Sequence, residues 1–201
     1  DSWEGKNLAE IKFVGDTPRP STRRLVPPFK AAKASAIPTI DGTLDADEWK
    51  DGVVYQFAYN QLNLQDQRPP KDQNDLYGEW KILYDKNVIY GMVTRVDEMT
   101  VTGHGDAWEN DNLEVFVDLA GTFAQIRSIV GQDWAAHALP GERTIERNED
   151  GTVAEFMVEL PADDLQGQII GWNIALSDND TGASGPRQHQ LYPIYGFNDS
   201  W

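Results

Sequence analysis

The chain has 201 residues, of which 40% are hydrophobic, and this is enough to bury one sizeable core. Its formal net charge of −16 excludes nucleic acid as a partner, because the phosphate backbone would be repelled, and it disfavours anionic membranes and acidic polysaccharides. The absence of cysteine excludes disulfides and cysteine-ligated zinc or iron–sulfur sites. No apolar run approaches the roughly 20 residues that span a bilayer, and the chain starts at Asp1 without a signal-peptide pattern, as a mature protein or a fragment would.

The succession of short apolar and polar runs predicts an all-β protein. Residues 6–13 alternate like a strand, and the proline-rich stretch 14–36 is predicted to be a linker or an extended arm. From residue 37 onward, β-branched and aromatic runs with period two are separated by Gly, Asp and Asn, so residues 37–201 are interpreted as one antiparallel, jelly-roll-like β-sandwich. The expected strands are 53–59, 79–84, 88–96, 113–118, 124–130, 143–147, 153–160 and 169–177.

The connections between these strands are expected to be short. Asp85-Lys86-Asn87 predicts a tight hairpin turn. Two short helical pieces are expected at 45–50, with Asp45 as the cap, and at 161–165. Three tryptophans, Trp49, Trp80 and Trp172, lie in apolar patterns and are expected in the core.

The triplet Asp-Ser-Trp occurs at residues 1–3 and again at 199–201. An offset close to the chain length is either chance or one period of a tandem array. In an array, residues 1–13 would be the final strand of one module, docked on their own domain or on a neighbouring copy by strand exchange. The sequence therefore predicts head-to-tail self-association through the N-terminal strand as one option.

Three phrases together resemble family 9 carbohydrate-binding modules, which share a DOMON-like β-sandwich. Residues 38–49 read PTIDGTLDADEW, residues 108–118 read WENDNLEVFVD, and residues 170–178 read IGWNIALSD. The second phrase is the most specific, and the order and spacing agree across 37–201. The resemblance implies a non-catalytic module that clamps a sugar, such as the end of a glucan or xylan chain, between two tryptophan rings.

The resemblance also implies the binding residues, since ring faces stack on the apolar face of a sugar while charged groups bind its hydroxyls. Trp108 matches the first ring of the clamp and Glu114 the sugar-binding carboxylate. At two positions the sequence departs from the family, with Ala175 in place of a Gln and Ile129 in place of an Asn, so two hydroxyl contacts are expected to be missing. The remaining matches are Trp201 for the second ring, Asn198 beside it, Trp3 as the equivalent ring in an array, and Arg127 and Arg187 as binding arginines.

Strand periodicity places Glu114 and Arg127 on one sheet face, away from Leu113, Val115 and Val117. An ordinary cross-strand ion pair is the alternative interpretation of the same pattern.

Four acid-rich pieces offer the oxygen ligands that suit Ca²⁺, although none has EF-hand spacing. The resemblance likewise implies structural calcium, which fits an extracellular or cell-surface location; no individual ligand is assigned. The pieces are Asp45/Asp47, Asp97/Glu98, Asp106/Asp111 and Asp178/Asn179/Asp180.

Three other classes of protein are alternatives to a binding module. An enzyme is disfavoured because the sequence has no Gly-x-Ser-x-Gly elbow, P-loop or HExxH motif. A haem-binding DOMON-type domain would need ligands such as Met92 and His104, neither of which lies in a recognisable motif. A structural module of a tandem surface protein or fibre is the third alternative.

Overall fold

A computed structural model describes residues 9–13, 29–57, 70–101, 110–119, 122–129, 135–137, 143–180 and 189–191, and for residues 9–13, 122–129, 135–137, 143 and 189–190 it describes the backbone. The described part is all-β, as predicted, and contains no helix that could cross a membrane. The strands are β1 (Ala9–Phe13), β2 (Phe29–Lys33), β3 (Tyr55–Gln56), β4 (Leu76–Asp85), β5 (Val88–Asp97), β6 (Asn112–Leu119), β7 (Thr122–Ile129), β8 (Ala135–His137), β9 (Arg143–Arg147), β10 (Val153–Glu159), β11 (Ile169–Asp178) and β12 (His189–Leu191).

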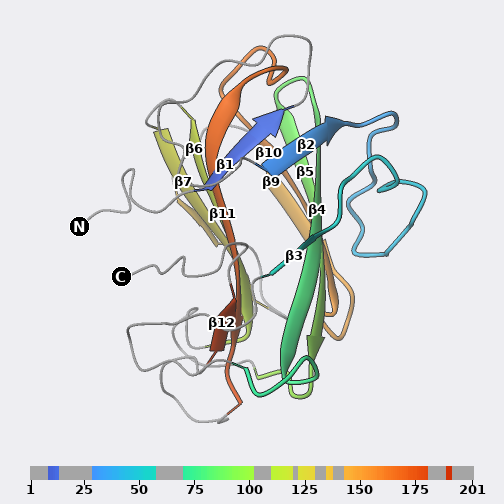
Figure 1. Cartoon of the computed structure of the whole chain (residues 1–201), viewed down its shortest axis with the longest axis vertical. Coiled ribbons are helices and arrows are strands. Elements are labelled where there is room, and N and C mark those ends of the chain that lie inside the picture. The colour runs from blue at the N-terminus through green and yellow to red at the C-terminus, as the bar shows by residue number, and fades with distance from the viewer. Residues whose placement is uncertain are drawn as a thin grey trace.

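The strands form two facing layers (Figure 1). Sheet A has the order β8-β7-β6-β11, with β12 also paired to β11. Sheet B has the order β4-β5-β10-β9, with β3 paired to β4. Within each sheet these pairs are antiparallel, as a sandwich requires.

β1 and β2 connect the two sheets along one edge. β1 pairs antiparallel with β11 and parallel with β2, and β2 pairs parallel with β4. β1 lies within residues 1–13, the segment predicted to be a terminal strand, and in this structure it pairs with strands of the same chain, whereas β2 lies within the stretch predicted to be a linker or arm. Phe29–Lys33 is a strand because its backbone groups bond to β1 and β4, which are distant partners that local sequence does not reveal.

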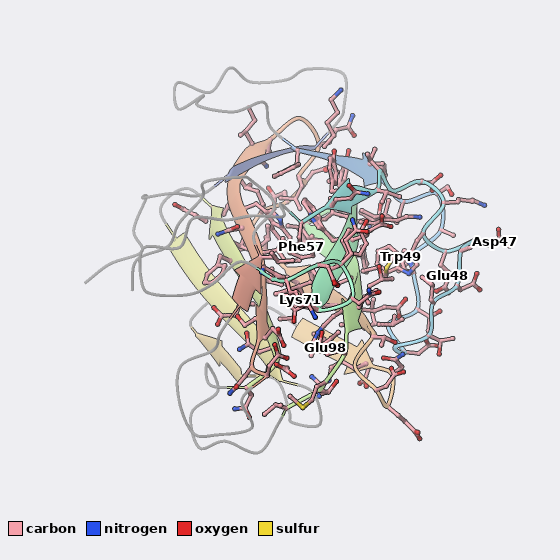
Figure 2. The ribbon with its side chains drawn as sticks, turned by 60° about the horizontal axis from the view of Figure 1, so that its bottom comes forward. Asp47, Glu48, Trp49, Phe57, Lys71 and Glu98 are labelled. Atoms are coloured by element: carbon pink, nitrogen blue, oxygen red, sulfur yellow. The ribbon has the colours of Figure 1, made fainter. Side chains whose placement is uncertain are left out.

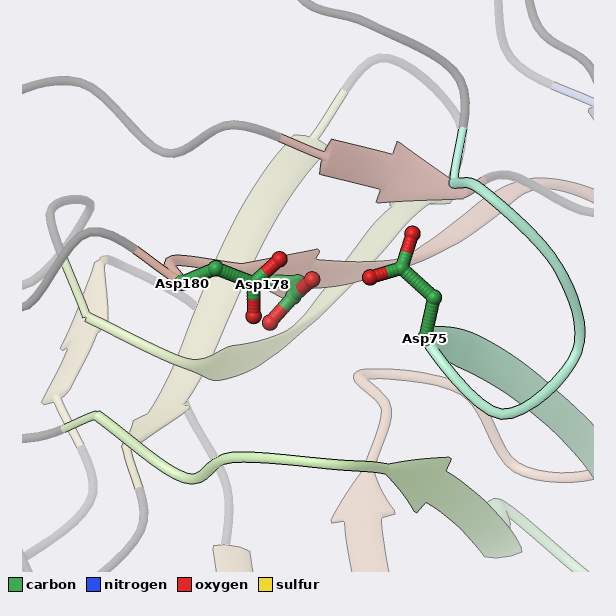
Figure 3. A group of neighbouring side chains, drawn as sticks. All are labelled: Asp75, Asp178 and Asp180. Carbon is green, nitrogen blue, oxygen red and sulfur yellow. The ribbon is translucent and has the colours of Figure 1, made fainter.

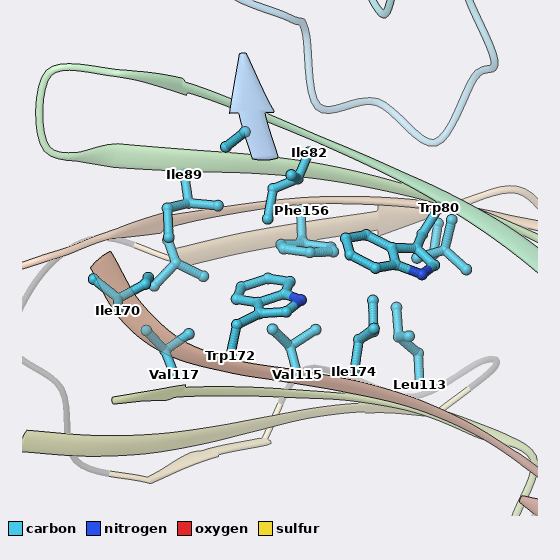
Figure 4. Close-up of a cluster of buried hydrophobic side chains, with 14 of the residues drawn as sticks. Trp80, Ile82, Ile89, Leu113, Val115, Val117, Phe156, Ile170, Trp172 and Ile174 are labelled. Carbon is cyan, nitrogen blue, oxygen red and sulfur yellow. The ribbon is translucent and has the colours of Figure 1, made fainter. Parts of the chain in front are cut away.

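The core lies between the sheets and is built on aromatic side chains from both (Figure 4). Trp172 of β11 is 0% exposed and stacks on Phe156 of β10, with ring centroids 6.2 Å apart. Trp80 of β4 lies 6.4 Å from the Trp172 ring. From sheet A, Leu113, Val115 and Val117 complete the contact, as the period-two pattern predicts.

The outer side of sheet B is covered by the segment 34–54, which carries Trp49. Trp49 is 0% exposed and packs with Leu83, Tyr90 and Met92 in a second apolar cluster. In Figure 2, Trp49 points towards the sheet while Asp47 and Glu48 of the same turn lie at the outer rim. All three tryptophans predicted to be core are therefore buried.

The two predicted helical pieces are wrong, because residues 46–50 form turns and residues 161–163 form a bend. Asp45 accepts a hydrogen bond from the Asp47 N–H at 2.8 Å, which closes a local turn in place of a helix cap. The predicted hairpin is confirmed: Asp85 pairs with Val88, and Lys86 takes the left-handed conformation, at φ 50°, that two-residue hairpin turns require.

Candidate functional site

The outer face of sheet A carries a row of aligned positions. Ala175 of β11 lies opposite Glu114 of β6, and Glu114 lies opposite Arg127 of β7. Directly opposed residues of antiparallel strands share a face, so the prediction that Glu114 and Arg127 lie on one face is confirmed. The face points away from the core, because the alternate residues Leu113 and Val115 belong to the core cluster.

The two positions where the sequence departs from the family pattern belong to this same face. Ala175 is the direct neighbour of Glu114, and Ile129 lies opposite Asn112, which is itself opposite Ser177. Compared with the family pattern, Ala175 and Ile129 therefore remove polar groups from the same face as the candidate carboxylate of Glu114.

This outer face carries polar side chains beside the apolar Phe116 and Ala175, and it is covered. Glu114 and Ser177 are 0% exposed and Asn173 is 1% exposed, although all three point away from the core. The Asn173 Oδ1 accepts the Ile174 N–H at 2.9 Å, whereas its Nδ2 has no hydrogen-bond partner in the described ranges. Because an orphaned buried amide is costly, Asn173 is a further candidate sugar donor. Sequence reasoning missed it, although it lies two residues before Ala175 on the same strand.

Five of the predicted binding residues, Trp3, Trp108, Arg187, Asn198 and Trp201, lie outside the described residues, and so do Asp106 and His104. Met92, the other haem-ligand candidate, packs in the cluster around Trp49 and is 5% exposed.

A second constellation, the acidic cluster, lies at one end of the sandwich. It comprises Asp75, Asp97, Asp111, Asp178 and Asp180. Carboxylate oxygens of Asp75, Asp178 and Asp180 lie within 4.8 Å of one another (Figure 3), and so do those of Asp97, Asp111 and Asp178. Four of these aspartates belong to the separate acid-rich pieces of the sequence, whereas Asp75 belongs to none of them.

The fold brings them together because each adjoins the end of a strand. Asp75 precedes β4 and Asp97 ends β5, and the pairing of Leu76 with Asp97 places both at the same end of sheet B. Asp111 precedes β6 and Asp178 ends β11, which are neighbours in sheet A. The cluster thus joins the two sheets.

Asp178 bears the electrostatic cost of bringing these carboxylates together. It is 0% exposed, and among the described residues neither carboxylate oxygen has a hydrogen-bond partner. Burial, followed by the charges of Asp111 and Asp180, raises the pKa of Asp178 to about 9. Burial and the neighbouring Asp75 and Asp180 also raise the pKa of Glu98.

Such a donor set fits a hard divalent cation. Ca²⁺ takes carboxylate and carbonyl oxygens and would supply the missing partner of Asp178. Asp75, Asp178 and Asp180 would hold it, and the ion would neutralise charges that otherwise repel one another.

Asp111 also ties the surrounding chain together. Its backbone N–H donates to the Val101 carbonyl at 3.0 Å, and its carboxylate accepts the Val101 N–H in return. The other carboxylate oxygen accepts the Asn179 N–H at 2.7 Å. The second signature phrase therefore contains a structural aspartate as well as the candidate sugar carboxylate Glu114.

The first family-like phrase, residues 38–49, supplies the hydrogen-bond donors for the buried carboxylate of Glu155 in β10. Glu155 Oε2 accepts the N–H groups of Asp41 and Gly42 at 3.1 and 3.0 Å, and Oε1 accepts the Trp49 indole N–H at 2.8 Å. Gly42 has φ 75°, and an added Cβ would lie 2.5 Å from the Arg147 carbonyl carbon, so glycine is required there. This phrase anchors the outer segment to sheet B.

The protein is thus a β-sandwich with a candidate binding site on the outer face of one sheet. Residues 40–127 match the family model described as carbohydrate family 9 binding domain-like. The match and the fold together confirm the resemblance to family 9 carbohydrate-binding modules.

Two solved structures share the fold. A family 9 carbohydrate-binding module from Caldicellulosiruptor kristjanssonii in complex with cellotriose is 16% identical, with a TM-score of 0.62 over 92% of this chain and 84% of that chain. A second structure from the same organism, in complex with glucose, is 16% identical, with a TM-score of 0.61 over 82% of this chain and 85% of that chain. Comparison with curated proteins gives no match.

Proposed function

We propose that the chain is a non-catalytic carbohydrate-binding module that binds the end of a neutral glycan outside the cell. The observation that carries the proposal is the row Ala175, Glu114, Arg127 on the outer face of sheet A. The family match over 40–127 and the fold shared with modules complexed with cellotriose and glucose support it. The net charge of −16 favours a neutral glycan over an acidic one.

In this proposal Glu114 and Arg127 bind the hydroxyl rim of the sugar, with Asn173 as a further donor. Trp108 and Trp201 stack on its two faces, Trp3 replaces one ring in an array, and Asn198 and Arg187 add polar contacts. Because Glu114 is 0% exposed, a sugar reaches it only when the face opens. We therefore expect association to be slower than at a site that needs no such opening.

The test is calorimetric titration with glucose, cellobiose, cellotriose, xylobiose and glucuronic acid in calcium buffer. Replacing the charged acceptor in Glu114→Gln should weaken binding by about ten- to a hundredfold, because a charge-assisted hydrogen bond becomes a neutral one or is lost. Trp108→Ala should abolish the heat. Glu146→Gln, the same change at an exposed position on β9, is the matched control and should bind as the parent does.

Absence of heat with every sugar would overturn the binding proposal and favour the structural-module alternative. An unchanged affinity in Glu114→Gln would keep sugar binding but place it elsewhere than on this face.

We propose further that the acidic cluster holds a structural Ca²⁺. The supporting observation is that the carboxylate of Asp178 is buried and accepts no hydrogen bond from the part of the chain that the structure describes. Millimolar calcium should raise the unfolding temperature of the EDTA-treated protein, and Asp178→Asn should remove that response while the exposed control Asp163→Asn retains it. An equal calcium response in parent and Asp178→Asn would refute this assignment.

Self-association through the N-terminal strand is the remaining proposal. β1 bonds by main-chain pairing on both sides, to β11 and to β2, and the same bonds form if β1 comes from a second copy. Residues 14–28 separate β1 from β2 and could span about 50 Å when extended, which is long enough to reach a neighbour. Concentration-dependent dimers in sedimentation would support exchange, whereas a monomer at all concentrations would contradict it.

A further inference from the structure

The outer face of sheet B is covered in one half and open in the other. Under the segment 34–54 the outward-facing residues of β4 and β5 are buried, as Leu83 and Met92 show. The cover ends beside Lys81, whose Nζ donates a hydrogen bond to the Trp49 carbonyl at 3.1 Å. Beyond it, the outward-facing side chains are half-buried or exposed, and we call the following set the open face: Gln56, Tyr77, Glu79, Thr94, Val96 and Val153.

Four members of the open face form a row across the sheet. Gln56 of β3 lies opposite Glu79 of β4. Glu79 lies opposite Thr94 of β5, which in turn lies opposite Val153 of β10. Directly opposed residues share one face of a sheet, and neighbouring strands lie about 4.8 Å apart, so the row is about 14 Å long. An extended ligand can therefore contact it at several points.

The polar groups of the open face are oriented by one another. Glu79 Oε1 accepts hydrogen bonds from the Tyr77 hydroxyl at 2.6 Å and from Gln56 Nε2 at 3.2 Å. The bond to Glu79 raises the pKa of Tyr77 to about 12, so the hydroxyl remains a donor at any physiological pH. A ligand meets side chains whose orientation is already set, which lowers the ordering cost of binding.

These groups suit a neutral carbohydrate. The carboxylate of Glu79, the amide of Gln56 and the hydroxyl of Thr94 can bond to the hydroxyl rim of a sugar. The Tyr77 ring and the methyl groups of Val96 can pack on its C–H groups. An acidic partner is disfavoured, because Glu79 is the one charged member of the open face. A protein partner would need a larger apolar centre than one tyrosine and two valines provide.

The open face differs in access from the face around Glu114. Glu114 is 0% exposed, so a sugar must enter the protein to reach it. On the open face Val96 is 45% exposed and Gln56 is exposed as well, so a glycan chain can lie on the sheet without entering the protein. The two faces belong to different sheets and lie on opposite sides of the sandwich (Figure 1).

We propose that the open face is a second carbohydrate site, which takes the interior of a neutral polysaccharide chain while the face around Glu114 takes a chain end. The inference rests on the proposed function and adds to it a second point of contact. Because the two sites lie on opposite sides, one module can join two chains of a polysaccharide. A matrix of many chains then holds the module more tightly than either site does alone.

The first experiment separates the two sites with two probes. Glucose is titrated by calorimetry, and hydroxyethylcellulose, a long soluble neutral glucan, is tested by retardation in affinity electrophoresis. Tyr77→Ala should weaken binding of hydroxyethylcellulose about tenfold, because the ring contact is lost, and leave glucose binding unchanged. Glu79→Gln should weaken it in the same direction, whereas the matched control Glu146→Gln, exposed on β9, should change neither.

The outcomes distinguish this inference from the proposed function. Parent-like retardation of Tyr77→Ala would overturn the second site and leave the proposed function intact. An equal loss of glucose binding in Tyr77→Ala would also overturn it, because the substitution would then act through the site at Glu114. If the parent binds neither probe, both proposals fail.

A second measurement keeps Tyr77 in place and covers the case in which Tyr77→Ala does not fold. The chain has no cysteine, so the thiol of a Val96→Cys variant is the one group that a maleimide labels rapidly. Hydroxyethylcellulose should slow this labelling several-fold and glucose should not. Thr144→Cys, at an exposed position of β9 outside the open face, should label at one rate throughout. Labelling of Val96→Cys at the same rate with and without hydroxyethylcellulose would contradict the proposal.

Discussion

Replacing Glu155 with Gln should destabilise the protein by about 2 kcal/mol, because the buried carboxylate has only donors around it. Its three partners are the Trp49 indole N–H and the backbone N–H groups of Asp41 and Gly42. A carboxamide offers one acceptor oxygen and one NH₂ group. If the amide oxygen keeps the two backbone donors, the NH₂ faces the indole N–H, and a buried donor without an acceptor costs about 1–3 kcal/mol.

The assay is urea unfolding followed by circular dichroism at pH 7, with the parent, Glu155→Gln, Trp49→Phe and the double variant. Phenylalanine has no N–H to be orphaned, so the glutamine should cost about 1 kcal/mol less in the Trp49→Phe background than in the parent. The reasoning is refuted if Glu155→Gln is as stable as the parent, or if the two changes add without coupling.

Three further predictions concern pH, packing and the edge strand. Burial raises the pKa of Glu155, so the folded protein holds a proton there more tightly than the unfolded chain does. This proton-linked increment adds to the hydrogen-bond difference expected at pH 7; it is full below the unfolded pKa of 4.5 and is lost as pH rises through the folded pKa. The stability margin of the parent over Glu155→Gln should therefore widen as pH falls from 7 towards 4.5, and a constant margin would contradict this. Gly91→Ala should lower the free energy of unfolding in urea by at least about 2 kcal/mol, because the new Cβ would lie 2.0 Å from Phe156 Cζ. The control Gly52→Ala, whose Cβ would meet the flexible Lys81 side chain, should lower it by under about 1 kcal/mol. Equal effects of the two substitutions would refute the packing argument. Deleting residues 1–13 should lower the unfolding temperature, and a synthetic peptide of those residues should restore it in proportion to its concentration; an unchanged temperature on deletion would show that β1 (Ala9–Phe13) does not stabilise the fold.

The strands that local pattern predicted are those whose alternation reflects a buried and an outer face. β6 and β11 have this form, and their register could be anticipated because Leu113 and Trp172 must face the core. β2 escaped prediction because FKAAK follows a proline-rich stretch and owes its extended form to parallel pairing with β1 and β4. The turn at Asp45 was mistaken for a helix start, since an aspartate that caps a helix and one that closes a local turn make the same short hydrogen bond.

The candidate site likewise has a part that the sequence predicts and a part that it does not. Glu114 and Arg127 could be placed on one face, because period two fixes the faces of a strand and the family phrases name the residues. The acidic cluster could not be assembled from sequence, because its members come from the ends of strands in both sheets. Asp75 stands apart from the acid-rich pieces, and the ion pair of Arg95 with Asp111 forms only after the sheets pack.

The position of β1 between β11 and β2 has a mechanical consequence. Main-chain hydrogen bonds run across the strands, so a pull along β1 from its N-terminal side loads the bonds to both neighbours together, in shear, and does not open them one by one. The two sheets would be held by the same short strand that transmits the pull. If the module anchors a larger protein to a polysaccharide surface through this end of the chain, its resistance to force is set by β1, and single-molecule extension should show one rupture at that strand before the sandwich opens.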